Sequence, residues 1–298
     1  MTEPPIASDA PVGVLVGQVA ALWRYPIKSM LGERRQGLEV ERRGVVGDRG
    51  YALWDVQARR VASAKQPQRW ADLLLFSARF LREPRRGEPL PPVAVQGPFA
   101  GPQAPAETLC SDDPALLDRL SQRLNRSLAL LDQPPAGASI DHYWPVVEGR
   151  ELQDATDQLV LQHGTFFDAC PIHALSTATL AELKRLEPGL DFAVERFRPN
   201  LLIDSGDASG FVEERWIGGV LAIGPQLQLA VDRDCPRCVI TTLAQPGLSA
   251  DLDILRATAR HNKVVAGIRL SVVQPGPVAV GDPVHWQPPA AANGLSAF

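Results

Sequence analysis

The stretch Asp232-Arg233-Asp234-Cys235-Pro236-Arg237-Cys238-Val239-Ile240-Thr241-Thr242 contains two of the four cysteines of the chain. Charged side chains flank both cysteines, and β-branched residues follow them. A soft thiolate beside cationic side chains is suited to binding a redox metal or to thiol chemistry. We expect Arg237 to lower the pKa of the neighbouring Cys238 thiol, which favours the deprotonated form that a metal needs. Cys238 is therefore the residue on which we expect the chemistry to depend, although a buried structural cysteine is the alternative.

The spacing of Cys235 and Cys238 is that of a C-x-x-C motif. This spacing also suits half of a zinc site or a dithiol redox pair. The chain has no second C-x-x-C, and its five histidines show no paired metal-ligand spacing. A thioredoxin-type motif opens a helix, whereas Val239–Thr242 has the β-branched composition of a strand. We therefore expect Cys235 to lie near the site without being a ligand.

The composition is that of a globular protein without a nucleic-acid partner. The chain has 298 residues, 45% of them hydrophobic and 21% charged, with a formal net charge of −4. Four cysteines in a chain of this length do not predict a disulfide scaffold, so we expect reduced thiols and a cytoplasmic location. Residues 1–14 read as a flexible leader that lacks a secretory signal. No stretch is long and apolar enough to predict a membrane span.

The hydrophobic pattern predicts a mainly β protein with α decoration. Short alternating segments recur along both halves, as in Val12–Arg24, and are separated by turns rich in Gly and Pro. Helices are expected at 115–124, at 176–186 with Ser176 as N-cap, and at 252–261. A linker at 133–137 separates two domains. We place the first domain at 15–135, the second at 136–290, and a tail at 291–298.

Five short motifs follow one another between about residues 18 and 286. They are Tyr25-Pro26-Ile27-Lys28-Ser29, Gly47-Asp48-Arg49, Phe197-Arg198-Pro199-Asn200, Arg237-Cys238-Val239-Ile240-Thr241-Thr242 and Val280-Gly281-Asp282-Pro283-Val284. Motifs in this order resemble those of one known family, the MOSC family. Within it, the chain is similar to the mitochondrial amidoxime reducing component and its bacterial relatives. The resemblance implies an N-terminal MOSC β-barrel domain, a MOSC β-barrel domain and a cofactor cleft between them.

The resemblance implies a molybdenum cofactor, a pterin with a terminal phosphate, and makes Cys238 its catalytic protein ligand to the metal. It maps the remaining cofactor contacts onto Lys28, Ser29, Arg49, Arg198, Asn200 and Arg237. Relatives often have Asp-Thr-Ser-Pro where this chain has Asp168-Ala169-Cys170-Pro171, so Ala169 and Cys170 would contact the phosphate through backbone N–H groups.

The residue types themselves fit an anionic ligand. Lys28, Arg49 and Arg198 suit a phosphate, and the Asn200 amide suits the hydrogen-bonding edge of a pterin. Each of these residues also has an alternative role that involves no ligand. The three cations could be solvated surface charges, and Asn200 could be a turn residue. Arg237 could instead pair with nearby aspartates. Asp168 could orient an arginine or a water molecule, or simply make a turn.

The function implied by the resemblance is reduction of N-hydroxylated compounds such as amidoximes, hydroxylamines and N-hydroxylated bases. No cysteine follows Cys238 to hold an iron–sulfur cluster, so electrons would come from a separate ferredoxin, cytochrome b5-like protein or flavoprotein reductase. The main alternative is a sulfur-carrier or cofactor-handling protein with a persulfide on Cys238. A silent pterin-binding protein is a third. Pyridoxal phosphate binding is implied only for the family at large.

Overall fold

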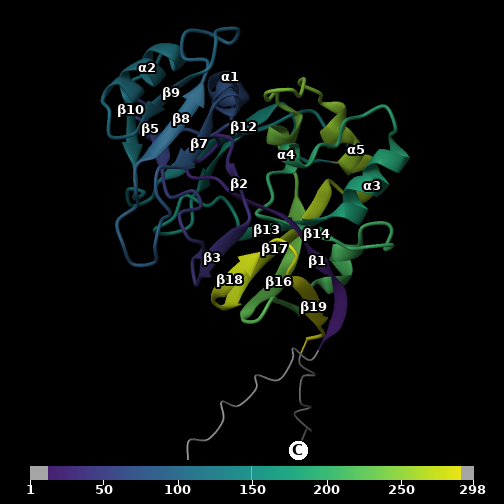
Figure 1. Ribbon diagram of the computed structural model, residues 1–298. Helices are drawn as coiled ribbons and strands as arrows, with labels where there is room; N and C mark the ends of the chain where they lie inside the picture. The colour runs from purple at the N-terminus through teal and green to yellow at the C-terminus, as the bar shows by residue number, and fades with distance from the viewer. Residues whose placement is uncertain (1–12, 149, 290–298) are drawn as a thin grey trace, which may run out of the picture.

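A closed seven-stranded β-barrel forms the largest sheet of the described residues (Figure 1). The computed structural model describes residues 13–148 and 150–289. Around the barrel the strand order is β14-β13-β17-β16-β15-β19-β1, and β1 pairs again with β14. The bounds are β1 Val14–Arg24, β13 Ile172–Ser176, β14 Leu201–Asp204, β15 Val220–Ile223, β16 Leu227–Pro236, β17 Val265–Gln274 and β19 Pro283–Gln287.

The first strand of the chain closes the barrel that the second half builds. β1 runs antiparallel to β14, with Leu22 opposite Leu201, and antiparallel to β19, with Val14 opposite Trp286. Its register shifts near Gly17, where a Cβ atom would lie 2.2 Å from the carbonyl oxygen of Asp204. Glycine is therefore required at this bulge, which lets one strand bend between two neighbours.

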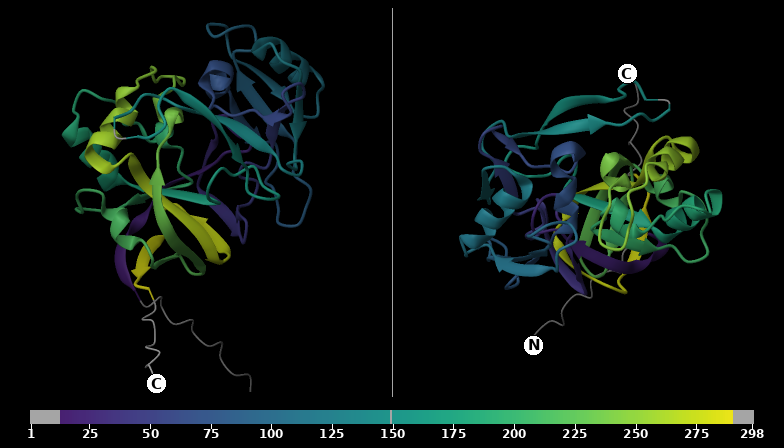
Figure 2. Two further views of the ribbon diagram at one scale, coloured as in Figure 1. Left: turned by 180° about the vertical axis from the view of Figure 1, so that it is seen from behind. Right: turned by 90° about the horizontal axis from the view of Figure 1, so that it is seen from above.

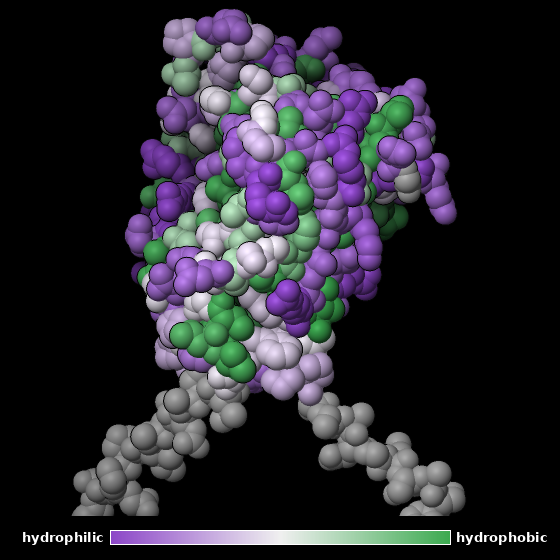
Figure 3. Space-filling view, turned by 90° about the vertical axis from the view of Figure 1, so that its right-hand side faces the viewer, coloured by the Kyte–Doolittle hydropathy of each residue, from purple (hydrophilic) through white to green (hydrophobic). Residues whose placement is uncertain are grey.

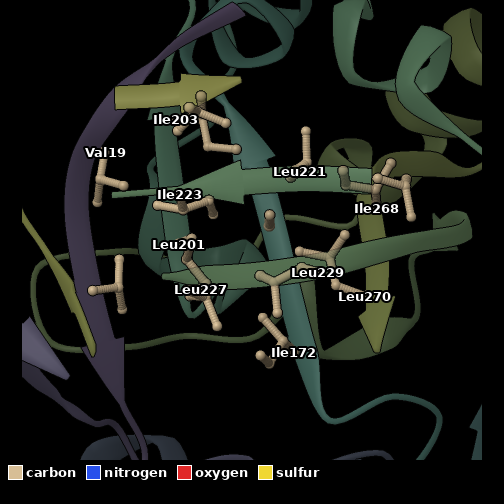
Figure 4. Close-up of a cluster of buried hydrophobic side chains, with 14 of the residues drawn as sticks. Val19, Ile172, Leu201, Ile203, Leu221, Ile223, Leu227, Leu229, Ile268 and Leu270 are labelled. Carbon is tan, nitrogen blue, oxygen red and sulfur yellow. The ribbon is translucent and has the colours of Figure 1, made fainter. Parts of the chain in front are cut away.

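Aliphatic side chains that alternate along the strands fill the barrel (Figure 4). Leu227, Leu229 and Val231 point inward from β16, and Ile268 and Leu270 from β17; each is at most 1% exposed. Burying a side chain of this size stabilises the fold by roughly 1.5–3 kcal/mol. The sequence-based prediction of a mainly β fold with a barrel is confirmed.

The first half packs small sheets around a second core that contains Phe76, Trp70 and Leu120. β2 (Glu33–Arg35) extends the barrel sheet beside β1, whereas β3 (Gly37–Glu41) pairs with β4 (Gly44–Val45) and with the late strand β18 (Gly276–Ala279). Two further three-stranded sheets complete this half. They are β10-β5-β6 (Leu128–Leu131, Ala52–Asp55, Arg60–Val61) and β7-β8-β9 (Ser77–Phe80, Val93–Gly97, Glu107–Cys110).

A long hairpin connects the two halves. It consists of β11 (Ser139–Trp144) and β12 (Ala155–Val160), which form a two-stranded sheet of their own within the described residues. The backbone N–H of Tyr143 donates to the carbonyl of Lys65 in the first half, and Arg150 donates to the carbonyl of Arg237 in the second. β12 accordingly lies between α1 and α4 in Figure 1, and the hairpin spans the two parts in the right panel of Figure 2.

The helices lie outside the sheets. α1 (Pro67–Trp70), η1 (Ala71–Leu75) and α2 (Ala115–Leu124) belong to the first half. α3 (Thr177–Leu186), α4 (Val194–Phe197), η2 (Val212–Trp216), η3 (Val239–Thr242) and α5 (Asp253–Asn262) belong to the second. The predicted cap of α3 is confirmed, because the Ser176 hydroxyl accepts the N–H of Thr179 at 3.0 Å.

The prediction of a strand at Val239–Thr242 is wrong, because these residues form a 3₁₀ turn. Their hydroxyls explain the difference. Thr241 Oγ1 donates to the carbonyl of Cys238 at 3.0 Å, and Thr242 Oγ1 donates to the carbonyl of Val239 at 2.8 Å. Local bonds of this kind compete with a sheet ladder. The apolar run that begins at Leu73 also has the composition of a strand, but residues 73–75 lie in η1 and β7 begins only at Ser77.

Hydrophilic side chains predominate on the face shown in Figure 3, where hydrophobic ones occur in small separate groups. Within residues 13–148 and 150–289, no helix is long and apolar enough to cross a membrane. All four cysteines are free thiols. The proposed leader and tail fall almost entirely outside the described residues.

Candidate functional site

A cavity of about 530 Å³ lies where the two halves and the hairpin meet. Its wall includes the segment after β1, the loops at Arg49 and Asp168, and the ends of α4 and β16, and the β11–β12 hairpin also contributes to it. Every residue that the sequence singled out for cofactor or metal binding lines it. These are Lys28, Ser29, Arg49, Ala169, Cys170, Arg198, Asn200, Arg237 and Cys238.

The cavity wall is strongly cationic in a chain whose net charge is negative. Seven cationic side chains line it against two carboxylates, those of Asp157 and Asp168. A concave wall with charge of one sign concentrates ligands of the opposite sign. The cavity therefore suits an anion. The cations are Lys28, Arg49, Lys65, Arg150, Arg198, Arg237 and Arg269.

Asp168 lies between two lysines at one side of this wall. Lys28 Nζ donates to Asp168 and, at 2.7 Å, to the carbonyl oxygen of Phe166, while Lys65 Nζ lies 3.1 Å from the other oxygen of Asp168. Burial acts to raise the pKa of Asp168, but the two ammonium groups outweigh it and hold this pKa well below the usual range. Asp168 is therefore a carboxylate that orients two lysines, whereas the sequence suggested an arginine, a water molecule or a turn.

Lys28 and Lys65 respond differently to the same carboxylate. Burial lowers the pKa of Lys28, and the attraction of Asp168 offsets only part of that effect. Burial also acts to lower the pKa of Lys65, but the attraction of Asp168, and then of Cys238 and Cys235, raises this pKa overall. Lys65 has no motif around it, and sequence reasoning missed it. Lys65 lies close to Asp168 and Cys238, which are distant from it in the sequence, so no local pattern marks it.

Tyr25 organises two of the predicted arginines. The guanidinium carbons of Arg49 and Arg198 lie 4.3 Å and 4.4 Å from the centre of its ring. Its hydroxyl donates to the carbonyl of Pro199, and burial raises the pKa of this phenol to about 12. Asp48 accepts from the Tyr25 backbone at 2.8 Å and pairs with Arg49. Both arginines are thereby held against one aromatic ring.

Arg198 presents a polar atom with no partner. Its Nη2 donates to the carbonyl of Met30 at 2.7 Å, while its buried Nη1 has no hydrogen-bond partner among the described residues. Burial lowers the pKa of Arg198 to about 10, so the group stays charged at neutral pH. A buried cationic N–H without a partner costs stability, and an anion in the cavity would satisfy it. This atom is direct evidence that the residues present fit an anionic group.

Three of the predicted residues adopt left-handed backbone conformations. The φ angles are 66° at Ser29, 47° at Arg49 and 53° at Arg198. This region is unfavourable for residues other than glycine and concentrates at functional sites. Ser29 also accepts the N–H of Ala64 through its hydroxyl at 3.0 Å, which leaves its own O–H to donate.

The Asn200 amide, in contrast, is used entirely within the protein. Its nitrogen donates to the carbonyl of Trp23 and to Asp48, and its oxygen accepts from the N–H of His173 and from Arg49. These four bonds exhaust the capacity of the amide. The expectation that this amide meets a pterin edge conflicts with this arrangement. Asn200 lines the cavity and holds Asp48 and Arg49 in position.

Cys238 lies at the N-terminal side of η3 with its side chain half-buried in the cavity wall. The hydrogen bonds of the Arg237 guanidinium within the described part of the chain do not include Cys238. Arg237 donates to Cys235 Sγ at 3.0 Å and to the carbonyl of Phe197 at 2.6 Å, and its Nη1 lies 3.3 Å from His173 Nε2. The predicted action of Arg237 therefore falls on Cys235, which precedes it by two residues at the end of β16, so that both side chains leave the extended backbone on the same side.

The pKa values of the Cys235 and Cys170 thiols are shifted in opposite directions. Burial acts to raise the pKa of Cys235, but His173 and Arg237 outweigh it and lower this pKa. Burial raises the pKa of Cys170, and so does the neighbouring Cys235. The sequence missed His173 and Arg269, which reach the cavity from the paired strands β13 and β17. Among the described residues, no group of three or more His, Cys, Asp and Glu side chains is placed to hold a metal ion.

Comparison with known families identifies the architecture. A family model for the MOSC N-terminal beta barrel domain matches residues 16–77, and one for the MOSC domain matches residues 162–285. The chain belongs to the MOSC family. The resemblance seen in the five motifs is thereby confirmed, and the cavity of this MOSC protein lies between the segments that the two models cover.

Individual relatives of this MOSC protein match over less than half of the chain. Molybdenum cofactor sulfurase 2 of Culex quinquefasciatus is 34% identical over 135 residues, which are 43% of this chain and 17% of that protein. Mitochondrial amidoxime reducing component 2 of Rattus norvegicus is 31% identical over 132 residues, as is its Homo sapiens counterpart. These matches cover 40% of this chain and 37% of each relative.

Two solved structures align with this chain at low sequence identity and with TM-scores below 0.5. The YUAD protein from Bacillus subtilis aligns over 91% of this chain and 94% of its own, with a TM-score of 0.44 and 11% identity. YiiM from Geobacillus stearothermophilus aligns over 48% of this chain and 71% of its own, with a TM-score of 0.31 and 12% identity.

Proposed function

We propose that the cavity binds a molybdenum cofactor and that this MOSC protein is an oxidoreductase for N-hydroxylated compounds. The observation that carries the proposal is the buried, unpartnered Nη1 of Arg198 in a cationic cavity that also contains the Cys238 thiol. A pterin phosphate would complete the bonding of the arginine, and a soft metal would take the thiolate. The names of the relatives agree with this combination.

Each side chain has a stated part in holding the cofactor. Cys238 would supply the protein thiolate to the metal. Lys28, Ser29, Arg49 and Arg198 would hold the phosphate, with backbone N–H groups at Ala169 and Cys170 in support. Asn200 and Arg237 would act indirectly, since their polar atoms are bonded largely to protein groups.

The chain's residues bind and orient, and the cofactor when bound supplies the two-electron redox couple. The overall reaction cleaves the N–O bond of the substrate, consumes two electrons and two protons, and releases water. Electrons would come from a separate ferredoxin, cytochrome b5-like protein or flavoprotein reductase. Purified protein should therefore fail to reduce benzamidoxime with NADH alone. Turnover under those conditions would contradict the need for a donor protein.

A second function has one observation in its favour. The relative with 34% identity is named a molybdenum cofactor sulfurase. In that reading Cys238 carries a persulfide, and the cationic wall grips the cofactor only in transit. The half-buried position of Cys238 on the cavity wall is compatible with either use.

One experiment separates the two functions. The protein is produced in a host that makes molybdenum cofactor, and molybdenum, pterin and labile sulfur are measured per chain. We expect about one molybdenum per chain in the wild type and its loss in Cys238→Ala, together with reductase activity. Cys110→Ala is the matched control, since Cys110 ends β9 away from the cavity. A wild type without bound molybdenum but with labile sulfur on Cys238 would support the sulfur carrier instead.

A further inference from the structure

One wall of the cavity comes from the β11–β12 hairpin and contains none of the residues that the family motifs brought to attention. It presents His142 and Trp144 from β11, Asp157 and Leu159 from β12, and Arg150 from the connection between the strands. His142 and Trp144 are two residues apart, so both point to the same face of the strand. The cavity thus has two sides of different chemistry. One is lined by the residues predicted to hold the cofactor, and the other, the hairpin side, is lined by residues of β11, β12 and their connection.

The hairpin side carries two buried ring nitrogens that lack partners. His142 is 7% exposed, and its Nε2 has no hydrogen-bond partner among the described residues; the same holds for Trp144 Nε1. The two rings lie against each other, with centroids 4.2 Å apart. An unpaired buried polar atom costs about 1–3 kcal/mol. Two such neighbours in one cavity wall indicate a ligand that pairs with both.

The protonation of these rings defines what that ligand must offer. Burial, and then the charge of Lys65, lower the pKa of His142 to about 4, so its imidazole is neutral at neutral pH. His142 Nδ1 lies 3.8 Å from a carboxylate oxygen of Asp157, which favours the proton on Nδ1 and leaves Nε2 as an acceptor. Trp144 Nε1 can only donate. The wall therefore offers one acceptor beside one donor.

We propose that His142 and Trp144 form the substrate subsite and select compounds that present a hydrogen-bond donor and an acceptor on adjacent atoms. An N–OH group does this: its O–H donates to His142 Nε2, and its nitrogen or oxygen accepts from Trp144 Nε1. This inference rests on the proposed function, because it names the side of the cavity that the substrate occupies. The pair would act as specificity residues, and the anion-binding residues would hold the cofactor.

Binding can be measured without turnover. The protein is isolated from the cofactor-producing host in its oxidised form and titrated calorimetrically without an electron donor. The two probes are benzamidoxime and its O-methyl ether, which keeps the ring and the nitrogen but lacks the O–H donor. We expect the wild type to bind benzamidoxime at least tenfold more tightly than the ether, because the ether leaves Nε2 of His142 unpaired.

Two variants and one control test whether His142 and Trp144 cause the preference for benzamidoxime over its ether. His142→Leu and Trp144→Phe should each weaken benzamidoxime binding by about 5- to 20-fold, and His142→Leu should bring the two probes within about twofold. Tyr143→Phe is the matched control, because Tyr143 lies between them on β11 and its hydroxyl bonds to Asp154 outside the cavity. It should retain the full wild-type preference.

Molybdenum and pterin are measured on the same samples. Equal binding of the two probes by the wild type would overturn the subsite. So would loss of pterin from His142→Leu and Trp144→Phe, which would assign the hairpin to the cofactor. A wild type that binds no molybdenum would overturn the proposed function alone, and a preference for benzamidoxime in that protein would still support the subsite.

Discussion

The barrel interior and the cavity are both buried, yet they are built in opposite ways. The barrel interior is filled by aliphatic side chains such as Leu229, Ile223 and Ile268, all at 0% exposure. The cavity wall buries charged groups, including Lys28 and Arg198, which are at most 8% exposed. The described barrel strands contain no non-glycine residue with a left-handed backbone, whereas the cavity places three such residues in left-handed conformations.

The difference shows where the molecule is stable and where it is prepared for a ligand. Apolar burial stabilises the folded state in proportion to the area removed from water. Buried charges and left-handed conformations weaken it unless something compensates them. The barrel is closed by seven strands and can tolerate an adjoining wall that is charged, strained and incompletely bonded. The four changes below test this division, beginning with the largest expected effect.

Truncation in the barrel should act on stability alone. Leu229→Ala removes a fully buried side chain and leaves a cavity, so the free energy of unfolding should fall by about 2–5 kcal/mol. Urea unfolding checks this value. Molybdenum per folded chain should stay at the wild-type level after the unfolded fraction is removed. A loss of less than about 1 kcal/mol would mean that the barrel interior is not the stabilising region.

The charged wall should make stability depend on pH through His142. The pKa of this imidazole is about 4 in the folded protein, lowered by burial and by Lys65, and about 6.5 when unfolded. Because the folded-state pKa is depressed, its contribution is complete above pH 6.5 and is lost as pH falls towards 4. Between pH 7.5 and 4.5 the wild type should lose about 2–3 kcal/mol that His142→Leu does not lose. Tyr143→Phe should follow the wild-type curve in urea unfolding at each pH.

Two buried arginines near α4 should separate binding from folding. Arg198→Met removes the unpaired N–H, so cofactor retention should fall at least tenfold, which is roughly the contribution of one charge-assisted hydrogen bond. Stability should change little, because removing a buried charge offsets the lost bond to the Met30 carbonyl. Arg196 is bonded instead to the carbonyls of Asp191, Thr241 and Ser249. Arg196→Met should therefore destabilise the protein and leave the pterin content of the folded fraction unchanged. The opposite pattern would assign Arg198 a structural role.

The smallest effect concerns backbone strain outside both regions. Lys263 caps α5 with the same φ of 53° that Arg198 has at the end of α4. Lys263 is exposed, so Lys263→Gly should raise the free energy of unfolding by about 0.5–1 kcal/mol without affecting the cofactor. Arg198→Gly relaxes the same conformation but should release the cofactor. Thermal unfolding measures the change in stability of each variant, and pterin content measures how much cofactor each variant retains. Equal pterin loss in both variants would show that the strain itself serves binding.

Much of the fold class and the membership of the cavity was predictable, because both follow from local signals. Alternating apolar residues marked most strands, and Ser176 marked the start of α3. The five ordered motifs contained seven of the nine residues predicted for the site, the Asp168–Pro171 segment supplied Ala169 and Cys170, and the structure gathers all nine around one cavity. Their binding roles stay predictions. Lys65, His142 and Trp144 were missed because nothing in their neighbours in sequence distinguishes them from ordinary surface residues.

The sequence alone determined the mainly β composition, the family and the set of chemically suited residues, since residue type and short-range order carry that information. Tertiary structure decided that β1 closes the barrel of the second half, that Val239–Thr242 forms a turn, and that Arg237 serves Cys235 rather than Cys238. Strand pairing joins residues far apart in the chain, and the direction of a side chain depends on the backbone that carries it. In the segment Asp232–Thr242, the sequence therefore predicted that the cysteines and arginines matter. It did not predict which thiol each cationic side chain would contact.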